Sequence, residues 1–167
     1  MHTLTLEPVT TPEQIETVAG LAGKIWREHY AAILESGQID YMLEQFQSAA
    51  AVADQLREGY RYYLFCIGGA AVGYLSIKPE EKRLFLSKLY VARDYRRRGV
   101  AGQALARLED LCRREGYDSI YLTVNKHNVS SIAAYNHMGF VKVLEQTVDI
   151  GQGYVMDDFV MERQMAK

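Results

Sequence analysis

The sequence predicts an α+β fold in which a mixed, mostly antiparallel sheet of about seven strands is flanked by helices on both faces. The chain has 167 residues, which is the length of one domain, and 49% of them are hydrophobic, enough to build a sizeable core. Apolar residues follow the order strand, helices, three strands, helix, strand, helix, two strands. Because no repeat or linker interrupts this order, we expect a single domain over residues 1–167.

Composition excludes several classes of protein. The net charge of −2 argues against a nucleic-acid-binding protein, which would be strongly basic. No apolar run approaches the ~18 residues that span a bilayer, and the N-terminus lacks the features of a signal peptide. Cys66 and Cys112 form no CxxC pair, and no HExxH or Cys/His cluster occurs. We therefore expect a cytoplasmic protein without a disulfide framework, a metal, a membrane or a nucleic-acid partner.

The N-terminal third combines one strand with three helical segments. The first helix has a clear start, because Thr11 can cap it, Pro12 suits the first helical position and Gln14 can close a capping box. The expected elements are a strand over Leu4–Val9, a helix from Pro12 to Ile33, an apolar helical stripe over residues 39–46 and a short helix over 50–58.

For the rest of the chain, the sequence predicts strands and two further helices. Gly68 and Gly69 suit a two-residue hairpin turn, since glycine tolerates positive φ at both positions. Gly116 and Gly139 each follow an apolar helical stretch and predict its end. The expected strands cover residues 62–67, 70–78, 84–91, 119–124, 140–150 and 154–163, and the expected helices cover 99–115 and 128–138.

The most informative segment runs from a strand through a basic loop into a helix. The first turn of a helix leaves backbone N–H groups unpaired and carries partial positive charge. Gly99 and Gly102 remove side chains from this turn, and Arg96, Arg97 and Arg98 add positive charge beside it. This arrangement predicts a cradle for phosphate or pyrophosphate.

Two standard phosphate motifs, GxxxxGK[ST] and GxGxxG after the first strand, are absent. Residues 96–101 instead resemble the [QR]-x-x-G-x-[GA] motif of the GNAT superfamily of N-acetyltransferases, with Ala101 as the small residue. Residues 128–140 resemble the second motif of that family, in which an Asn precedes a Tyr by seven positions and a Gly-Phe follows. The two motifs together, at this separation, carry the resemblance.

The resemblance implies a GNAT fold with a V-shaped opening between the fourth and fifth strands, where acetyl-CoA enters. Backbone groups of Leu89 and Val91 would bind the pantetheine arm, and main-chain amides of residues 97–102 would bind the pyrophosphate. The cofactor-binding positions implied are Leu89, Tyr90, Val91, Arg96, Arg97, Arg98, Gly99, Val100, Ala101, Gly102, Asn128, Ser131 and Tyr135.

The resemblance also implies the catalytic groups. The backbone N–H of Leu89 would polarise the acetyl carbonyl, and Tyr135 would donate to the departing sulfur. The acceptor amine has a pKa near ~10.4 in water and must lose a proton before it attacks. Many family members carry a Glu base on the fourth strand, whereas this chain has Ser87 there. The candidate bases elsewhere are Glu28, His29, Asp40, Glu44 and Asp157.

The acceptor is predicted from charge alone. Residues 1–60 hold nine acidic and three basic side chains, a net charge of −6, whereas residues 61–167 carry +4. An acidic acceptor side favours a cationic amine, such as a polyamine, an aminoglycoside or a lysine of a peptide. The positions assigned to the acceptor are His29, Tyr30, Asp40 and Glu44.

The sequence therefore predicts an acetyl-CoA-dependent N-acetyltransferase acting on an amine of a small molecule or peptide. The alternative is a non-catalytic acyl-CoA-binding regulator of the same fold, which the missing carboxylate on the fourth strand leaves open. A homodimer is left open as well.

Overall fold

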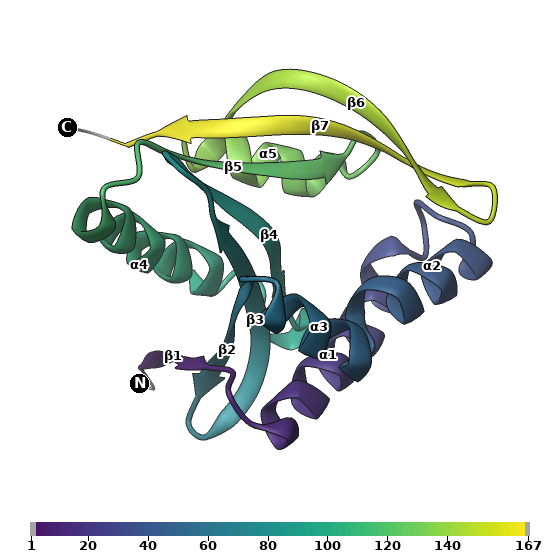
Figure 1. Cartoon of the computed structure of the whole chain (residues 1–167), viewed down its shortest axis with the longest axis horizontal. Helices are drawn as coiled ribbons and strands as arrows, with labels where there is room; N and C mark the ends of the chain where they lie inside the picture. Colours follow the sequence, from purple (N-terminus) through teal and green to yellow (C-terminus); the bar gives the residue numbers. More distant parts are fainter. Residues whose placement is uncertain (1–2, 166–167) are drawn as a thin grey trace.

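The computed structural model describes residues 3–165 and contains one seven-stranded sheet in the order β1-β2-β3-β4-β5-β7-β6 (Figure 1). All neighbouring strands are antiparallel except β4 and β5, which are parallel. The predicted class, a mixed and mostly antiparallel sheet of about seven strands, is confirmed. The strands are β1 (Leu4–Pro8), β2 (Arg61–Ile67), β3 (Ala70–Pro79), β4 (Arg83–Val91), β5 (Ser119–Asn125), β6 (Val141–Gly151) and β7 (Tyr154–Gln164).

Local sequence signals set the helix ends. Thr11 and Gln14 form the predicted capping box at the start of the first helix, and Gly99 and Gly116 flank the fourth, both with positive φ. The helices are α1 (Pro12–Tyr30), α2 (Ser36–Met42), α3 (Ala49–Arg57), α4 (Val100–Glu115) and α5 (Val129–His137), with a π-helical turn η1 (Leu43–Gln47) and a 3₁₀ turn η2 (Arg93–Tyr95).

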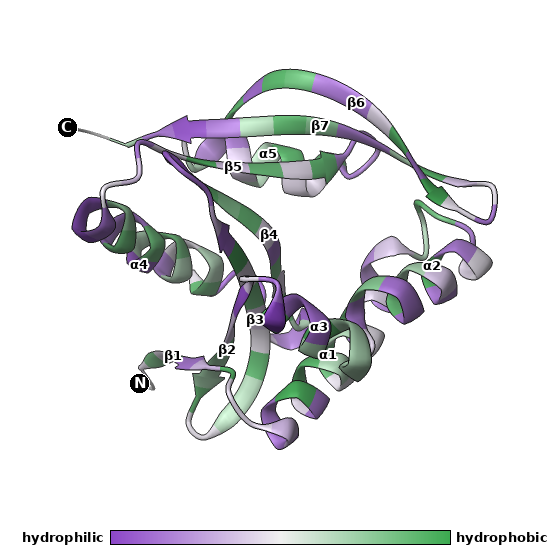
Figure 2. Cartoon of the chain, viewed as in Figure 1, coloured by the Kyte–Doolittle hydropathy of each residue, from purple (hydrophilic) through white to green (hydrophobic). Residues whose placement is uncertain are grey.

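Helices cover both faces of the sheet, as predicted. One core cluster packs α4 and α5 against the sheet, and a second packs α1, α2 and α3 against the opposite face. Hydrophobic and hydrophilic residues alternate along α1 and α4, as a half-buried helix requires (Figure 2). The helical layer of α4 and α5 and the helical layer of α1, α2 and α3 therefore come together at the ends of β4 and β5.

The sheet is interrupted in its middle. β4 and β5 pair only from Arg83 to Phe85 and from Ser119 to Tyr121, after which the two strands diverge. The edge of β4 beyond Phe85 therefore has no strand partner on the β5 side within the described residues. The V-shaped opening implied by the resemblance is present.

A bulge in β4 lies just beyond this point. Lys88 pairs with Ser76 and Leu86 pairs with Ile77, so Ser87 is an extra residue without an opposite partner on β3. A bulge changes which face the following side chains reach. Tyr90 consequently packs with the α1 cluster, whereas Leu89 and Val91 pack with the α4 cluster.

Some boundaries differ from those predicted. The first helix ends at Tyr30 rather than Ile33, and the apolar stripe over residues 39–46 is split between α2 and the π-turn η1. The side chain of Gln47, which ends η1, is buried against the hydroxyls of Tyr62 and Tyr74. The hydrogen bonds of the Gln47 side-chain amide inside the core stabilise the π-turn η1. The spacing of apolar residues in the sequence does not indicate these hydrogen bonds.

Within residues 3–165, none of the helices has the length and apolar character needed to cross a bilayer.

Gly73 offers a test of the packing of β3 against β4. A Cβ at this position would lie 2.3 Å from the Tyr90 carbonyl oxygen and 2.8 Å from the Phe65 ring. We expect Gly73→Ala to destabilise the fold by about 1–3 kcal/mol, because backbone and ring must move apart. Gly20→Ala is the matched control, since a Cβ there meets nothing within 4 Å and Ala favours helices. Urea unfolding measures both variants, and a Gly73→Ala protein as stable as Gly20→Ala would contradict this account.

Candidate functional site

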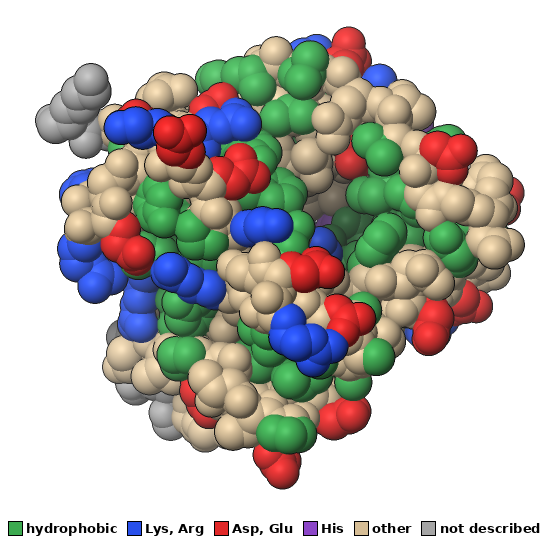
Figure 3. Space-filling view, viewed as in Figure 1, with side chains coloured by type: hydrophobic (Ala, Val, Ile, Leu, Met, Phe, Trp, Pro, Cys, Tyr) green, Lys and Arg blue, Asp and Glu red, His purple; other side chains and the backbone are tan. Residues whose placement is uncertain are grey.

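A cavity of about 790 Å³ opens where β4 and β5 separate. Its walls come from α1, α2, β4, the loop before α4, β5, α5 and β7, so both helical layers contribute to it. Figure 3, viewed as Figure 1, shows a hollow near the centre of the visible face, bordered by hydrophobic and charged side chains. The cavity is therefore a product of the interrupted sheet.

One end of the cavity is cationic. Arg96 and Arg97 line it, and the Arg96 guanidinium donates from Nε to the Val91 carbonyl oxygen at 2.9 Å, which ties the loop to the end of β4. Arg97 and Gly99 both have positive φ, 62° and 78°, and α4 begins at Gly99 without a side-chain cap. The first amides of α4 are thus free of a competing side-chain acceptor, as an anion site requires.

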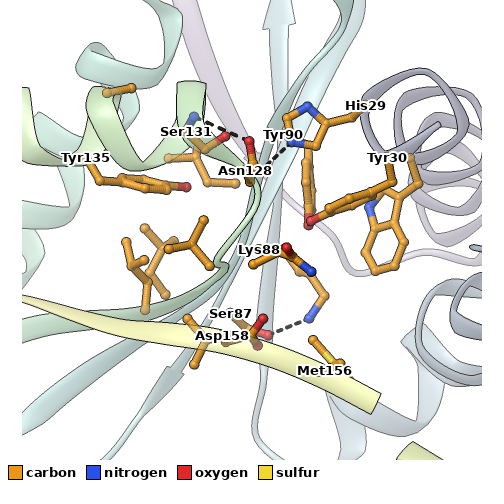
Figure 4. Close-up of a pocket in the computed structure, with 18 of the residues that line it drawn as sticks. His29, Tyr30, Ser87, Lys88, Tyr90, Asn128, Ser131, Tyr135, Met156 and Asp158 are labelled. Atoms are coloured by element: carbon orange, nitrogen blue, oxygen red, sulfur yellow. Dashed lines mark hydrogen bonds between the residues drawn. The ribbon is translucent and has the colours of Figure 1, made fainter. Parts of the chain in front are cut away.

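The wall formed by α5 carries the residues of the second motif. Asn128 accepts from the Ser131 amide at 3.4 Å, and its Nδ2 lies 2.8 Å from Nε2 of His29 on α1. The Tyr135 hydroxyl makes no hydrogen bond to a described residue and points toward the middle of the cavity (Figure 4). Burial raises the pKa of Tyr135, so this hydroxyl is a protonated donor at neutral pH.

The wall formed by α1 is aromatic. The hydroxyls of Tyr30 and Tyr90 lie 2.9 Å apart, and Trp26 packs edge to face on Tyr30. Burial raises the pKa of Tyr30 to about 12. Burial, together with the nearby Arg96 guanidinium, lowers the pKa of His29. Because the Asn128 amide donates to Nε2, the His29 ring is neutral with its Nε2 lone pair occupied.

Two ionisable groups, one buried and one half-buried, line the cavity opposite α5. Lys88 donates from Nζ to Ser87 Oγ at 2.8 Å, and burial lowers the pKa of Lys88 to about 8. Asp158 on β7 is 3% exposed, and burial, with the neighbouring Asp157 carboxylate, raises its pKa to about 6. Figure 4 shows Lys88, Ser87 and Asp158 on the same side of the cavity.

A second cavity of about 490 Å³ adjoins the first. The two share Phe46, Tyr60, Ser87 and Lys88, so they meet at the β4 bulge. The second cavity has an acidic border contributed by η1, α3 and the residue after α3, namely Glu44, Asp54 and Glu58. The acidic border therefore lies next to the place where β4 and β5 separate.

The structure brings most of the predicted site residues to the first cavity. The residues that line it are His29, Tyr30, Leu89, Tyr90, Val91, Arg96, Arg97, Ala101, Asn128, Ser131 and Tyr135. Arg98, Gly99, Val100 and Gly102 do not line it. Arg98 instead lies over the Tyr95 ring, and Val100 is buried in the core.

Two predicted acceptor residues lie elsewhere. Asp40 is exposed and paired with Arg27, and Glu44 borders the second cavity. A helical pattern in the sequence indicates which residues are polar, but it does not show which polar side chains line a cavity once the helices pack together. Asp40 lines neither cavity, and its part in acceptor binding stays a prediction.

The candidate base Asp157 also lies outside the cavity. It pairs with Lys126 at 2.9 Å and with Thr147, and these partners lower its pKa. Asp158 is the carboxylate that faces inward, because successive side chains of a strand point to opposite faces. Glu28, a further candidate, does not line the cavity and lies 3.9 Å from Arg93.

The sequence indicated no role for Lys88, and it indicated Asp157, not Asp158, as the candidate base near the end of the chain. The alternation of β7 could have indicated Asp158, since it shares a face with Met156 and Val160. No comparable signal identifies Lys88, because a bulge shifts its register. Among the described residues, no three His, Cys, Asp or Glu side chains are grouped to hold a metal ion.

Sequence comparison relates the chain to acetyltransferases. It is 27% identical over 122 residues to human "N-acetyltransferase 8", covering 73% of this chain and 52% of that protein. It is 33% identical over 73 residues to "N-alpha-acetyltransferase 50" of Danio rerio, covering 43% of this chain and 44% of that protein. The chain thus spans about half the length of the curated relatives it matches.

Solved structures share the whole fold. The PaiA N-acetyltransferase of Thermoplasma acidophilum in complex with coenzyme A superposes with a TM-score of 0.79 at 20% identity, over 97% of this chain and 99% of that one. A GCN5-related N-acetyltransferase of Rhodopseudomonas palustris gives 0.80 at 22% identity, over 99% of this chain and 98% of that one.

Residues 23–140 match the sequence model of the acetyltransferase (GNAT) family, whose acetyl donor is acetyl-CoA. The matched region contains the basic loop and both motifs. The chain therefore belongs to the acetyltransferase (GNAT) family.

Proposed function

We propose that this chain is an acetyl-CoA-dependent N-acetyltransferase that acts on a cationic primary amine of a small molecule or peptide. The observation that carries the proposal is the interrupted sheet: one cavity joins an uncapped helix N-terminus at its cationic end to a buried carboxyl at its other side. This polarity suits a donor with a pyrophosphate and an acceptor with an ammonium group.

The residues at the cationic end fit the cofactor. The amides of residues 97–102 and the guanidinium groups of Arg96 and Arg97 would bind its pyrophosphate. The unpaired edge of β4 at Leu89 and Val91 offers backbone groups to an extended arm, and the Leu89 N–H is positioned to polarise a carbonyl. Acetyl-CoA supplies an acetyl group activated as a thioester.

Tyr135 serves as the hydrogen-bond donor to the leaving sulfur. Its hydroxyl has no competing partner among the described residues, and its ring is held edge to face on Phe140 with centroids 5.6 Å apart. Because its pKa is raised above that of an ordinary phenol, full proton transfer to a thiolate is unfavourable. Tyr135 therefore stabilises the developing charge by donating rather than by ionising.

Asp158 serves as the general base. It lines the cavity, whereas Asp40, Asp157 and Glu28 do not, and the Nε2 of His29 already accepts from Asn128. A carboxyl with a pKa of about 6 is ionised at neutral pH and basic enough to accept a proton. The missing carboxylate on β4 is thus replaced by one from β7.

The acceptor enters past the acidic border of the second cavity. Glu44, Asp54 and Glu58 lie along it, and exposed charges of this kind concentrate a cation while each contributes only about 0.2–1 kcal/mol. Tyr30 and Tyr90 then offer an aromatic wall to the acceptor. A non-catalytic regulator of the same fold would need no inward-facing base, so Asp158 favours the enzyme.

Thiol release from acetyl-CoA, measured across a panel of amines, tests the proposed function. We expect repeated turnover with polyamines or lysine peptides and much less with amino acids that carry a free carboxylate. Bound acetyl-CoA without turnover on any amine would favour the regulator, and a preference for anionic acceptors would reject the cationic amine.

Tyr135→Phe removes one oxygen and keeps the packing on Phe140. We expect kcat to fall by about ten- to a thousandfold with unchanged cofactor affinity, since ~1.4 kcal/mol accounts for each factor of ten. Tyr117→Phe is the control, because Tyr117 packs against the α4 core and does not line the cavity. A Tyr135→Phe enzyme at full speed would assign this residue to packing alone.

Gly102→Val tests the pyrophosphate site. A Cβ on Gly102 meets nothing within 4 Å, so the variant should fold, yet its side chain would stand beside the first amides of α4. We expect acetyl-CoA to bind at least about tenfold more weakly in calorimetry, a loss of ~1.4 kcal/mol. Gly20→Val, on an open position of α1, should bind normally. Equal affinity in both variants would place the pyrophosphate elsewhere.

Asp158→Asn gives two linked readouts. Wild-type kcat/KM should rise about tenfold per pH unit up to a pH of about 6. Asp158→Asn should not show this acidic limb of the pH profile, and its rate should be lower by a factor of about 10²–10⁴. Burial raises the folded pKa of Asp158 above its unfolded value, so wild-type stability falls as pH rises from about 4 to about 6. Asp158→Asn should therefore be more stable than wild type at pH 8, by about 1–3 kcal/mol, and equal to it near pH 3.

Asp157→Asn is the matched control for this variant. Its pKa is lowered in the fold by Lys126 and Thr147, so its removal should weaken stability slightly at neutral pH, the opposite sign, and leave kcat/KM unchanged. Loss of the acidic limb in Asp157→Asn rather than in Asp158→Asn would contradict the assignment of the base.

A further inference from the structure

Lys88 is a half-buried cation that the proposed mechanism does not use. It lies on β4 directly before Leu89, and it lines both cavities. Its Nζ donates to Ser87 Oγ at 2.8 Å, and no carboxylate of the described residues lies within 4.0 Å of it. A half-buried lysine that faces two cavities without a carboxylate partner calls for an explanation.

The β4 bulge places this side chain. With Ser87 as the extra residue, Lys88 shares a strand face with Tyr90, which packs in the α1 cluster. Its side chain therefore reaches into the acceptor side of the cavity. Its own strand continues into the backbone groups at Leu89 that are proposed to hold the acetyl carbonyl.

The surroundings favour a neutral amine at this position. None of the carboxylates that line the two cavities is close enough to Nζ for an ion pair. The ionisable groups that line the cavities with Lys88 are His29, Tyr30, Glu44, Asp54, Glu58, Tyr60, Tyr90, Arg96, Arg97, Tyr135 and Asp158. Burial lowers the pKa of Lys88 to about 8, against ~10.4 in water, so the neutral form of Nζ is more populated at pH 7 than in an ordinary lysine. A neutral amine has the lone pair that a nucleophile needs.

We propose that Lys88 is itself an acceptor, and that its Nζ takes the acetyl group from acetyl-CoA bound in the same cavity. The inference rests on the proposed function, because it requires the cofactor to lie along β4. A bond forms between Nζ and the acetyl carbon, the bond from that carbon to sulfur breaks, and the proton lost from Nζ leaves on the sulfur of free coenzyme A. No other reactant is needed.

Acetylation of Lys88 would change the charge inside the two cavities that this residue lines. Acetylated Lys88 is neutral, so the positive charge shared by the two cavities disappears while Asp158 and the acidic border remain. A cationic amine would then meet no like charge at the β4 bulge. Acetylation of Lys88 would thus prepare the chain for the class of acceptor proposed above.

The test needs no knowledge of the natural acceptor. The purified chain is incubated with acetyl-CoA alone, and intact mass followed by peptide mapping reports how many acetyl groups it gains and where. We expect one acetyl group per chain on Lys88, before any exposed lysine reacts. Lys88→Arg should gain none at this rate, and Gly102→Val should react more slowly because it binds the donor less well. Lys78→Arg is the matched control, since Lys78 lies on β3 over the Tyr60 ring.

Calorimetric binding of acetyl-CoA separates the outcomes. Tight binding with an unmodified Lys88 would overturn this inference and leave the proposed function standing. Absence of binding would overturn both. Acetyl groups spread over the exposed lysines, at the rate seen in the urea-unfolded chain, would show chemical acetylation only and would likewise overturn the inference.

Discussion

The divergence of β4 from β5 after Phe85 and Tyr121 is the constraint on which the rest of the site depends. A strand edge in the middle of a sheet carries backbone donors and acceptors that need partners, and an isolated edge of this kind would be costly in a sealed core. Here the edge faces a cavity of about 790 Å³, so an extended ligand can complete the ladder that the two strands leave unfinished. The same divergence lets residues of both helical layers reach one space.

The bulge at Ser87 adds a second consequence. It separates the part of β4 that pairs with β5 from the part that borders the cavity, and it turns Lys88 toward the side of the cavity that we propose takes the acceptor. Asp158 is buried and Lys88 is half-buried, and this loss of solvent lowers the pKa of the amine to about 8 and raises that of the carboxyl to about 6. Burial thus favours the neutral form of each, the form in which an amine attacks and a carboxyl has already accepted a proton.

The parts of this structure that local signals determine were predictable. The capping box at Thr11, the paired glycines at 68–69 with φ of 58° and 83°, and the helix start at Gly99 are set by residues within a few positions of each other. The two family motifs likewise lie where the strand-loop-helix context indicates. The sequence therefore indicated the basic loop and α5 as walls of the cavity, although Arg98, Gly99, Val100 and Gly102 do not line it.

The side of the cavity that we propose takes the acceptor could not be predicted from the sequence, because it depends on contacts between distant segments. Which of Asp157 and Asp158 faces inward is decided by the register of β7 between β5 and β6. The exposure of Asp40 and its pairing with Arg27 depend on how α2 lies against α1, and the position of Lys88 depends on a bulge opposite Ser76 and Ile77. Composition indicated an acidic acceptor side, but only the packing of the layers shows which carboxylate lines the cavity.

A crystal structure of the chain with coenzyme A bound tests the central claim most directly. The account predicts an extended cofactor between β4 and β5, with its pyrophosphate on the amides of residues 97–102, its arm along Leu89 and Val91, and its sulfur within hydrogen-bonding distance of the Tyr135 hydroxyl. Coenzyme A bound outside this opening, or with its sulfur remote from Tyr135, would contradict it.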